Sequence, residues 1–218
     1  MERLFGVEGK QVVVTGGSRG IGEMIARGFV EAGAHVVISA RKAEACDETA
    51  AELDAIEGPG SCMSVPADLS TQDGVDALAA AARERCGGTL HVLVNNAGAT
   101  WGEPLEEYPE SAFDKLFNIN VKGAFLLTQA LLPELKAAGT EDDPSRVINI
   151  GSIDGIRTPA METYAYSTTK AGILALTRHL AKNLVREHVN VNAIAPGPFE
   201  SKMMAFALGS DEGKQMVA

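Results

Sequence analysis

The sequence has few cysteines and no long apolar run. Its three cysteines, Cys46, Cys62 and Cys86, form no Cys-x-x-Cys pair. Their odd number and their spacing argue against a disulfide framework or a metal site and favour a reducing compartment. No stretch approaches the roughly 18 apolar residues that a membrane-spanning helix needs. Residues 1–10 also lack the apolar centre of a signal peptide. We therefore expect a cytoplasmic protein with no bound metal and no membrane association.

Basic residues are in the minority. Lys and Arg number 19 against 29 Asp and Glu, which gives a formal net charge of −10. Nucleic-acid binding depends on clustered cations, so this balance argues against it, although one anionic cofactor can still bind where the local charge is positive. Aromatic residues make up only 5% of the chain, whereas glycine occurs 23 times, which indicates many tight turns.

Short apolar runs alternate with longer amphipathic stretches along the chain. The runs predict strands at residues 11–14, 35–39, 61–65, 91–94, 146–150 and 189–194. Helices are predicted at residues 21–32, 43–56, 71–86, 111–135 and 163–186. Most of the strands are continuous in Val and Ile, as in a parallel sheet that is buried on both faces. The pattern predicts an α/β fold with a doubly wound parallel sheet of Rossmann type, in a single domain over residues 1–218.

A glycine-rich turn follows the first predicted strand and precedes the first helix. It reads Thr15-Gly16-Gly17-Ser18-Arg19-Gly20-Ile21-Gly22. Glycines here permit a tight turn and let the backbone approach a phosphate, while the N-terminus of the helix attracts negative charge. The spacing Gly-x-x-x-Gly-x-Gly is neither GxGxxG nor a P-loop. We interpret it as a dinucleotide-binding turn, with a plain glycine-rich turn as the alternative.

The end of the second predicted strand indicates which dinucleotide binds. Enzymes that use NAD commonly place a carboxylate there for the ribose 2′-hydroxyl, whereas this chain has Ser39-Ala40-Arg41-Lys42. Arg41 can bind a 2′-phosphate, and Arg19 in the glycine turn can add a second cation. These residues predict NADP(H) rather than NAD(H). The alternative is that Arg41 and Lys42 are a solvated strand end.

Tyr166 and Lys170 are four residues apart in a predicted helix, which places them on one face. A tyrosine with an ordinary pKa near 10 is a weak acid-base catalyst, and lowering that pKa to about 7 takes roughly 4 kcal/mol. We expect the Lys170 ammonium to supply part of this, together with a positively charged nicotinamide. Ser152 follows a buried strand, where its hydroxyl can bind a substrate carbonyl. An ordinary helical pair and a turn serine are the alternatives.

Polar residues also follow other strands. Asn95-Asn96-Ala97-Gly98 ends the fourth strand, where amides can join neighbouring strand ends and small residues leave room for an adenosine. Asp68 follows the third strand and either accepts a hydrogen bond from an adenine or caps the next helix. Asn120 lies inside the long predicted helix, where it either holds a water or marks a kink.

Together these residues resemble the short-chain dehydrogenase/reductase family, over roughly residues 7–203. The matching features are the glycine turn, Asn95–Gly98, Asn120, Ser152, Tyr166 with Lys170, and Pro196-Gly197. The resemblance implies that Tyr166 is the general acid/base and that Lys170 lowers its pKa and holds the nicotinamide ribose. It implies that Ser152 orients the carbonyl and that Asn120 supports a proton-relay water. The residues implied to contact the cofactor are Gly16, Gly17, Ser18, Arg19, Gly20, Ile21, Gly22, Arg41, Asp68, Leu69, Asn96, Ala97, Gly98, Tyr166, Lys170, Pro196, Gly197, Phe199 and Ser201.

Within the family, the chain is most similar to 3-oxoacyl-acyl-carrier-protein reductases, and among these to the rhamnolipid-type branch. The resemblance implies that the segment after residue 205 is a substrate lid, with Phe199, Met203, Met204 and Phe206 as apolar lining; ordinary core residues are the alternative. Members of the family usually continue into a further strand, so we expect the final strand to be missing and the chain to be truncated. The family also implies a homo-oligomer, a tetramer or dimer.

The predicted function is NADPH-dependent reduction of a ketone to an alcohol. The resemblance implies a hydrophobic substrate such as a 3-oxoacyl thioester. Two alternatives remain open: an NAD(P)-dependent polyol or sugar-acid dehydrogenase of the same family, and a dinucleotide-binding regulator without catalysis. The set of Asn120, Ser152, Tyr166 and Lys170 argues against the regulator, because a pure sensor needs no proton donor.

Overall fold

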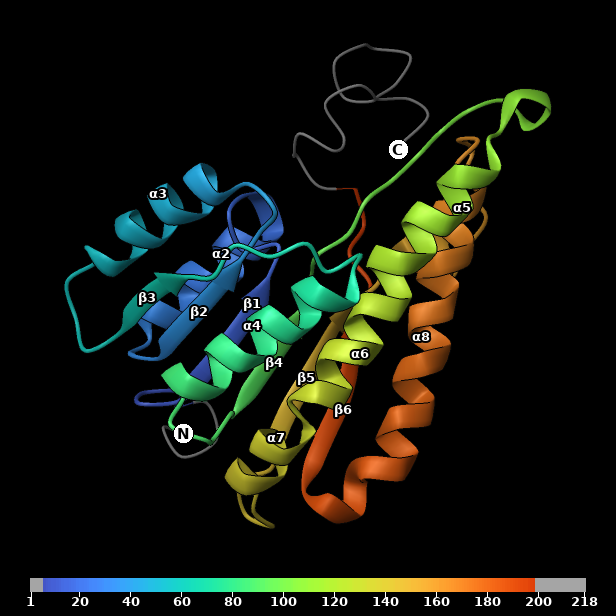
Figure 1. Cartoon of the computed structure of the whole chain (residues 1–218). Coiled ribbons are helices and arrows are strands. Elements are labelled where there is room, and N and C mark those ends of the chain that lie inside the picture. Colours follow the sequence, from blue (N-terminus) through green and yellow to red (C-terminus); the bar gives the residue numbers. More distant parts are fainter. Residues whose placement is uncertain (1–5, 199–218) are drawn as a thin grey trace.

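The computed structural model describes residues 6–198, which form one parallel sheet with helices on both faces (Figure 1). The six strands lie in the order β3-β2-β1-β4-β5-β6, and every neighbouring pair is parallel. Their bounds are β1 Gln11–Thr15, β2 His35–Ser39, β3 Ser61–Ser64, β4 Val92–Asn95, β5 Ser145–Ile150 and β6 Val189–Ile194. The predicted doubly wound α/β fold is confirmed. The predictions for the lid and the final strand lie outside the described residues.

The helices divide between the two faces of the sheet. They are α2 Gly20–Glu31, α3 Ala43–Asp54, α4 Gln72–Arg85, α5 Glu110–Phe117, α6 Gly123–Ala130, α7 Leu132–Ala138 and α8 Tyr164–Leu184. Short turns are η1 Leu105–Glu107, η2 Asn118–Lys122, η3 Ile153–Gly155 and η4 Val185–Glu187. Residues of α4, α6, α7 and α8 pack on one face, and residues of α2 and α3 pack on the other.

Alternate residues of each central strand supply these two cores. Val13 packs with the α4 side, whereas Val12 and Val14 pack with the α2 side, and all three are fully buried. Such a strand has no solvent-facing side, which explains why its sequence is an unbroken apolar run.

The long helix predicted at residues 111–135 is wrong, because three helices occupy that region. The π-helical turn η2 separates α5 from α6, and α7 starts afresh with a proline in its first turn. At the start of α6, Gly123 lies so close to the loop between β3 and α4 that a Cβ there would be 2.3 Å from the Leu69 carbonyl oxygen. This contact is tertiary, so the helical periodicity of the sequence does not reveal it.

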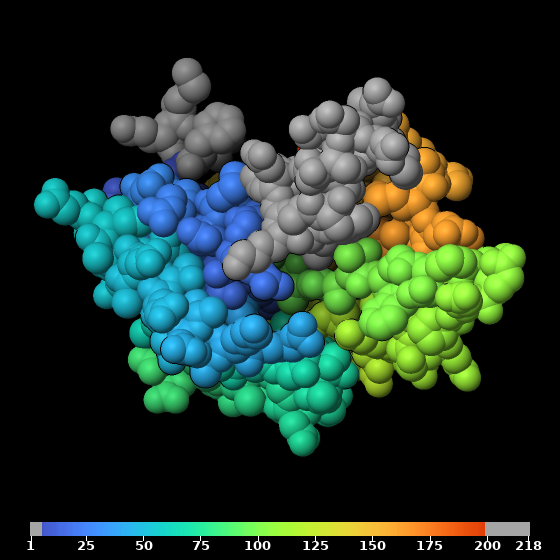
Figure 2. Space-filling view, turned by 90° about the horizontal axis from the view of Figure 1, so that it is seen from above, coloured from blue at the N-terminus to red at the C-terminus, as the bar shows by residue number. Residues whose placement is uncertain are grey.

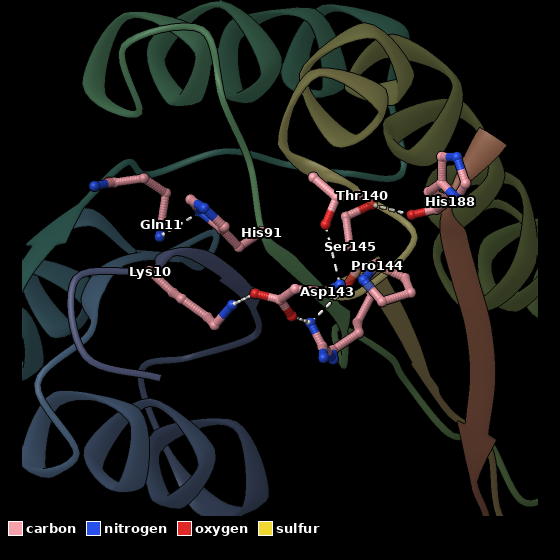
Figure 3. Close-up of polar contacts among 9 residues, drawn as sticks. Lys10, Gln11, His91, Thr140, Asp143, Pro144, Ser145 and His188 are labelled. Carbon is pink, nitrogen blue, oxygen red and sulfur yellow. Dashed lines mark hydrogen bonds and ion pairs between the residues drawn. The ribbon is translucent and has the colours of Figure 1, made fainter. Parts of the chain in front are cut away.

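The charged groups at the amino ends of the strands form a compact cluster (Figure 3). Asp143 accepts from the Lys10 ammonium at 2.5 Å and from the Arg146 guanidinium at 2.9 Å, and these contacts hold its pKa below the ordinary value. The His91 ring accepts a hydrogen bond from the Gln11 main chain at 3.0 Å. Burial and the Lys10 charge lower the pKa of His91, so the ring stays neutral and keeps this bond.

Within residues 6–198, no helix is both long and apolar enough to cross a bilayer. The same part of the chain contains no group of three or more His, Cys, Asp or Glu side chains that could hold a metal ion. The three cysteines are buried and unpaired.

Candidate active site

The glycine turn is fastened to the end of β4. The Asn96 amide donates to the main-chain oxygens of Thr15 at 2.9 Å and Gly16 at 3.2 Å. In return, the Thr15 hydroxyl accepts from the main-chain N–H groups of Asn96 at 2.9 Å and Ala97 at 3.0 Å. The prediction that asparagines join neighbouring strand ends is confirmed for β1 and β4. Thr15, which the sequence reading did not single out, is the other half of this link.

The start of α2 is open to an anion. No side chain in the described part of the chain caps this helix, so its first N–H groups lack the partner that a capping residue would supply. Gly20 has a left-handed φ of +58°, and a Cβ there would meet nothing within 4 Å. Gly22 is needed for packing instead, because its Cβ would lie 2.2 Å from the Gly16 carbonyl oxygen. The turn therefore fits the pyrophosphate of a dinucleotide.

Two exposed arginines lie near this turn. Among the described residues, neither Arg19 nor Arg41 forms an ion pair within 4.0 Å. The positive charge of Arg41 nevertheless helps to lower the pKa of Asp68. Burial alone would raise the pKa of Asp68, but hydrogen bonds from Ser70 together with Arg41 outweigh it and lower that pKa. Both arginines therefore have guanidinium groups to offer a 2′-phosphate.

The loop from β3 to α4 contains two of the predicted cofactor residues. One oxygen of Asp68 accepts from the Ser70 main chain at 3.0 Å and from its hydroxyl at 2.7 Å. The alternative role of Asp68 as a helix cap is wrong, because Thr71 caps α4 by accepting from the Gly74 main chain at 3.1 Å. The Leu69 side chain is buried in the core, so only its main chain can contact a cofactor.

Ser152, Tyr166 and Lys170 come together at the carboxyl end of β5. Ser152 and Lys170 are buried, and Tyr166 is partly buried. The Lys170 ammonium lies 5.7 Å from the centre of the Tyr166 ring and donates to the Ile150 main-chain oxygen at 2.7 Å. All of these groups come from the second half of the chain. Figure 2 looks down on this end of the sheet, with the blue segments on one side and the green and orange segments on the other.

Burial dominates the charge state of this group. It raises the pKa of Tyr166, a hydrogen bond from Ser152 opposes it, and the Asp154 carboxylate raises the pKa further. Within the described residues the Lys170 ammonium donates to the Ile150 carbonyl and forms no hydrogen bond to the Tyr166 hydroxyl. Burial lowers the pKa of Lys170 to about 8. Without a cofactor these groups keep Tyr166 protonated at neutral pH, and the expectation that Lys170 and a bound nicotinamide together lower its pKa stays a prediction.

Asn120 is fully engaged with the protein. It is buried in the π-helical turn, and its amide N–H groups donate to the Ala99 carbonyl at 3.0 Å and the Thr169 hydroxyl at 2.9 Å. Its amide oxygen accepts from the Ala99 main chain at 2.8 Å. Both donors of the side chain are used, so the side chain positions the loop after β4. The support of a proton-relay water by Asn120 stays a prediction. Gly98 lies against it, where a Cβ would be 3.1 Å from the amide oxygen.

The loop after β6 also reaches the site. The Pro196 main-chain oxygen accepts from Ile153, one residue past Ser152, at 3.0 Å. A Cβ on Gly197 would meet nothing within 4 Å. The other predicted residues of this segment, Phe199 and Ser201, lie outside the described residues, as do Met203, Met204 and Phe206.

Two side chains near the site were missed by the sequence reading. The Tyr108 hydroxyl accepts from the main chain of Ala165, next to Tyr166, at 3.2 Å, and its ring packs edge-on against Tyr164. Asp154 sits two residues beyond Ser152. Nothing in the spacing indicates Tyr108, whereas the nearness of Asp154 to Ser152 was a usable signal.

Comparison with known proteins defines the class. A family model described as short chain dehydrogenase matches residues 10–210, and the chain belongs to this family. The membership predicted from the sequence is confirmed.

Among individual relatives, the chain is 50% identical over 203 residues to the rhamnolipids biosynthesis 3-oxoacyl-acyl-carrier-protein reductase of Pseudomonas aeruginosa, covering 93% of this chain and 78% of the relative. It is 37% identical over 191 residues to sorbitol dehydrogenase of Cereibacter sphaeroides, covering 88% of this chain and 71% of the relative. The RhlG/NADP active-site complex of Pseudomonas aeruginosa superposes with a TM-score of 0.91 at 47% identity, covering 98% of this chain and 82% of that one. The L-sorbose reductase of Gluconobacter frateurii, complexed with NADPH and L-sorbose, superposes with a TM-score of 0.86 at 31% identity. This match covers 97% of this chain and 79% of the reductase.

Proposed function

We propose that the protein is an NADPH-dependent reductase that converts the ketone of a 3-oxoacyl thioester, or a similar hydrophobic carbonyl, to the alcohol. The observation that carries the proposal is the meeting of Ser152, Tyr166 and Lys170 beside a glycine turn whose helix N-terminus has no side-chain cap. The acyl substrate follows from the 50% identity to a 3-oxoacyl-acyl-carrier-protein reductase. Sorbitol dehydrogenase, the relative that is named for a polyol, is less similar, at 37% identity.

The cofactor is held by groups from both halves of the chain. The N–H groups at the start of α2, with Gly16 to Gly22, bind the pyrophosphate. Arg19 and Arg41 bind the 2′-phosphate, and Asp68, Leu69, Asn96, Ala97 and Gly98 border the adenosine side. Tyr166 and Lys170 bind the nicotinamide ribose, and Pro196 and Gly197 border the nicotinamide. When bound, NADPH supplies the hydride that reduces the carbonyl carbon.

The chain's own residues handle the carbonyl oxygen. Ser152 donates a hydrogen bond to it, which holds the carbonyl in place and stabilises the negative charge that develops. Tyr166 then donates its phenolic proton to the same oxygen, which becomes the alcohol. The raised pKa keeps Tyr166 protonated but makes it a weaker acid; the proton can still be transferred because the alkoxide that hydride transfer creates is far more basic than the phenolate. Asn120 acts as a positioning residue through Ala99 and Thr169.

Consumption of NADPH in the presence of an acetoacetyl thioester tests the proposal. The wild-type protein should oxidise NADPH only when the thioester is present, and the product should be the 3-hydroxyacyl thioester. A protein that binds NADPH tightly yet transfers no hydride to any 3-oxoacyl compound would instead favour the regulator.

We also propose that the chain works in the cytoplasm as one domain and assembles into a homotetramer or dimer. Supporting an assembly, Phe113, Phe117 and Phe125 lie at intervals of four and eight residues along α5–α6 and are 42%, 51% and 37% exposed. Exposed aromatic stripes of this kind favour association. Light scattering measures the assembly, and fractionation of the source cells measures the location.

A further inference from the structure

A partly buried carboxylate lies beside the proton donor and takes no part in the reaction described above. Asp154 is the middle residue of η3, two residues after Ser152. Within residues 6–198 its carboxylate has no ion-pair partner within 4.0 Å. The charged residue that acts on it is Arg157, on the same loop, and burial raises the pKa of Asp154 more than Arg157 lowers it.

Three contacts hold the turn that carries this carboxylate. The Asp154 main chain donates to the Ser152 hydroxyl at 3.2 Å, and the preceding residue, Ile153, donates to the Pro196 main-chain oxygen at 3.0 Å. On the other side, Gly155 is pressed against α8, where a Cβ would lie 2.5 Å from the carbonyl carbon of Lys170. The turn therefore cannot move away from α8, and the backbone of Asp154 stays next to the Ser152 hydroxyl.

Two positive groups also lie near the site. The Lys170 ammonium donates to the Ile150 carbonyl and keeps its charge, and Arg157 is exposed. The Asp154 carboxylate still contributes to the raised pKa of Tyr166, so its charge acts on the phenol in their presence. A carbonyl bound by Ser152 and Tyr166 therefore also feels the Asp154 charge.

We propose that Asp154 is a specificity-determining residue that makes the site discriminate against carbonyl substrates carrying their own negative charge and thereby favours uncharged esters and thioesters of 3-oxo acids. The inference deepens the proposed function and rests on it. Two like charges a few ångströms apart in a partly desolvated site repel strongly enough to change binding about tenfold, whereas a neutral ester is not repelled.

A pair of substrates that share one ketone tests this directly. Steady-state kinetics at saturating NADPH give kcat/KM for ethyl acetoacetate, which is neutral, and for acetoacetate, which is anionic. We expect Asp154→Asn to raise kcat/KM for acetoacetate about tenfold while leaving the ester within about twofold. Asp154→Glu keeps the charge and should keep the wild-type preference. Asp142→Asn is the matched control, because it makes the same change in net charge at an exposed position in the loop before β5.

Each outcome bears on a different claim. If Asp154→Asn changes kcat/KM for both substrates by the same factor, the residue is structural and the inference is overturned. If the wild-type protein reduces neither ethyl acetoacetate nor an acetoacetyl thioester, the proposed function fails first, and the inference with it.

Discussion

At the amino ends of the strands the charged groups are paired with one another, whereas at the carboxyl ends they are left for a ligand. Asp143 lies between Lys10 and Arg146 (Figure 3), and its pKa is lowered because its charge is stabilised. At the other end, burial lowers the pKa of Lys170, which means that burying its charged form destabilises the folded protein. One end of the sheet contributes stability, and the other gives up stability to keep reactive groups in position.

The largest effect should follow from removing the proton donor. Tyr166→Phe keeps the ring and deletes the hydroxyl, so we expect kcat to fall by about 10²–10⁴-fold while NADPH still binds. Tyr164→Phe is the matched control, because Tyr164 lies two residues away and its hydroxyl contacts only Glu162 within the described residues. Hydride transfer measured with an acetoacetyl thioester decides the matter. A Tyr166→Phe protein as active as the Tyr164→Phe protein would contradict the mechanism.

The burial of Lys170 should appear in the pH dependence of stability. Its folded pKa of about 8 lies below the ordinary 10.5, so the unfolded chain binds more protons above pH 8. Wild-type stability should therefore rise relative to Lys170→Met as the pH increases above 8. At neutral pH the penalty carried by the lysine is about 3 kcal/mol.

Urea unfolding at several pH values between about 7 and 9 measures this difference. Cys62 and Cys86 also have raised pKa values, but they are present in both proteins and cancel in the comparison. If the difference in the free energy of unfolding between the two proteins does not change with pH, burial of the Lys170 charge does not destabilise the fold.

Reversing a charge near the glycine turn should change cofactor choice. Arg41→Asp replaces an attraction to the 2′-phosphate with a repulsion, so we expect the Kd for NADPH to rise about 100-fold while the Kd for NADH changes little. Arg186→Asp makes the same charge change at an exposed position just before β6. Titration of both dinucleotides by fluorescence gives the two constants. If the Arg41→Asp protein binds NADPH and NADH as tightly as the wild type does, Arg41 does not select NADP(H).

The smallest effect should come from the charge cluster. Asp143→Asn removes two ion pairs, but the side chain is half exposed, so we expect a loss of only about 1 kcal/mol in the free energy of unfolding and no change in kcat/KM. Because the folded pKa of Asp143 is lowered, this contribution is present at neutral pH and disappears as the pH falls below the ordinary value of 3.8. Denaturant unfolding at pH 7 and at about pH 3 measures it; an equal difference at both values would contradict the ion-pair explanation.

The strands and the glycine turn could be predicted because their signals are local. Three consecutive valines, as in β1, leave no solvent-facing side, and the helix start after Arg19 follows directly from the glycine spacing. A kink at Asn120 is one of the two alternatives that the sequence offers, and a π-helical turn is found there. Its cause could not be predicted, since the side chain contacts Ala99 and Thr169, which are distant in the sequence. The partner of Lys170 was also out of reach, because spacing places this residue on the right helical face but does not show that its ammonium donates to the Ile150 carbonyl.

The contact between Gly155 and the backbone of α8 limits how this enzyme can acquire new substrates. Any side chain at that position would push the loop off the helix and displace Lys170, which we propose as a catalytic residue. Backbone remodelling is therefore a poor evolutionary route here, whereas exchange of the neighbouring Asp154 side chain alters the charge near Ser152 and leaves the main chain where it is. Variants selected for altered substrates should accumulate changes at residue 154 and retain glycine at 155.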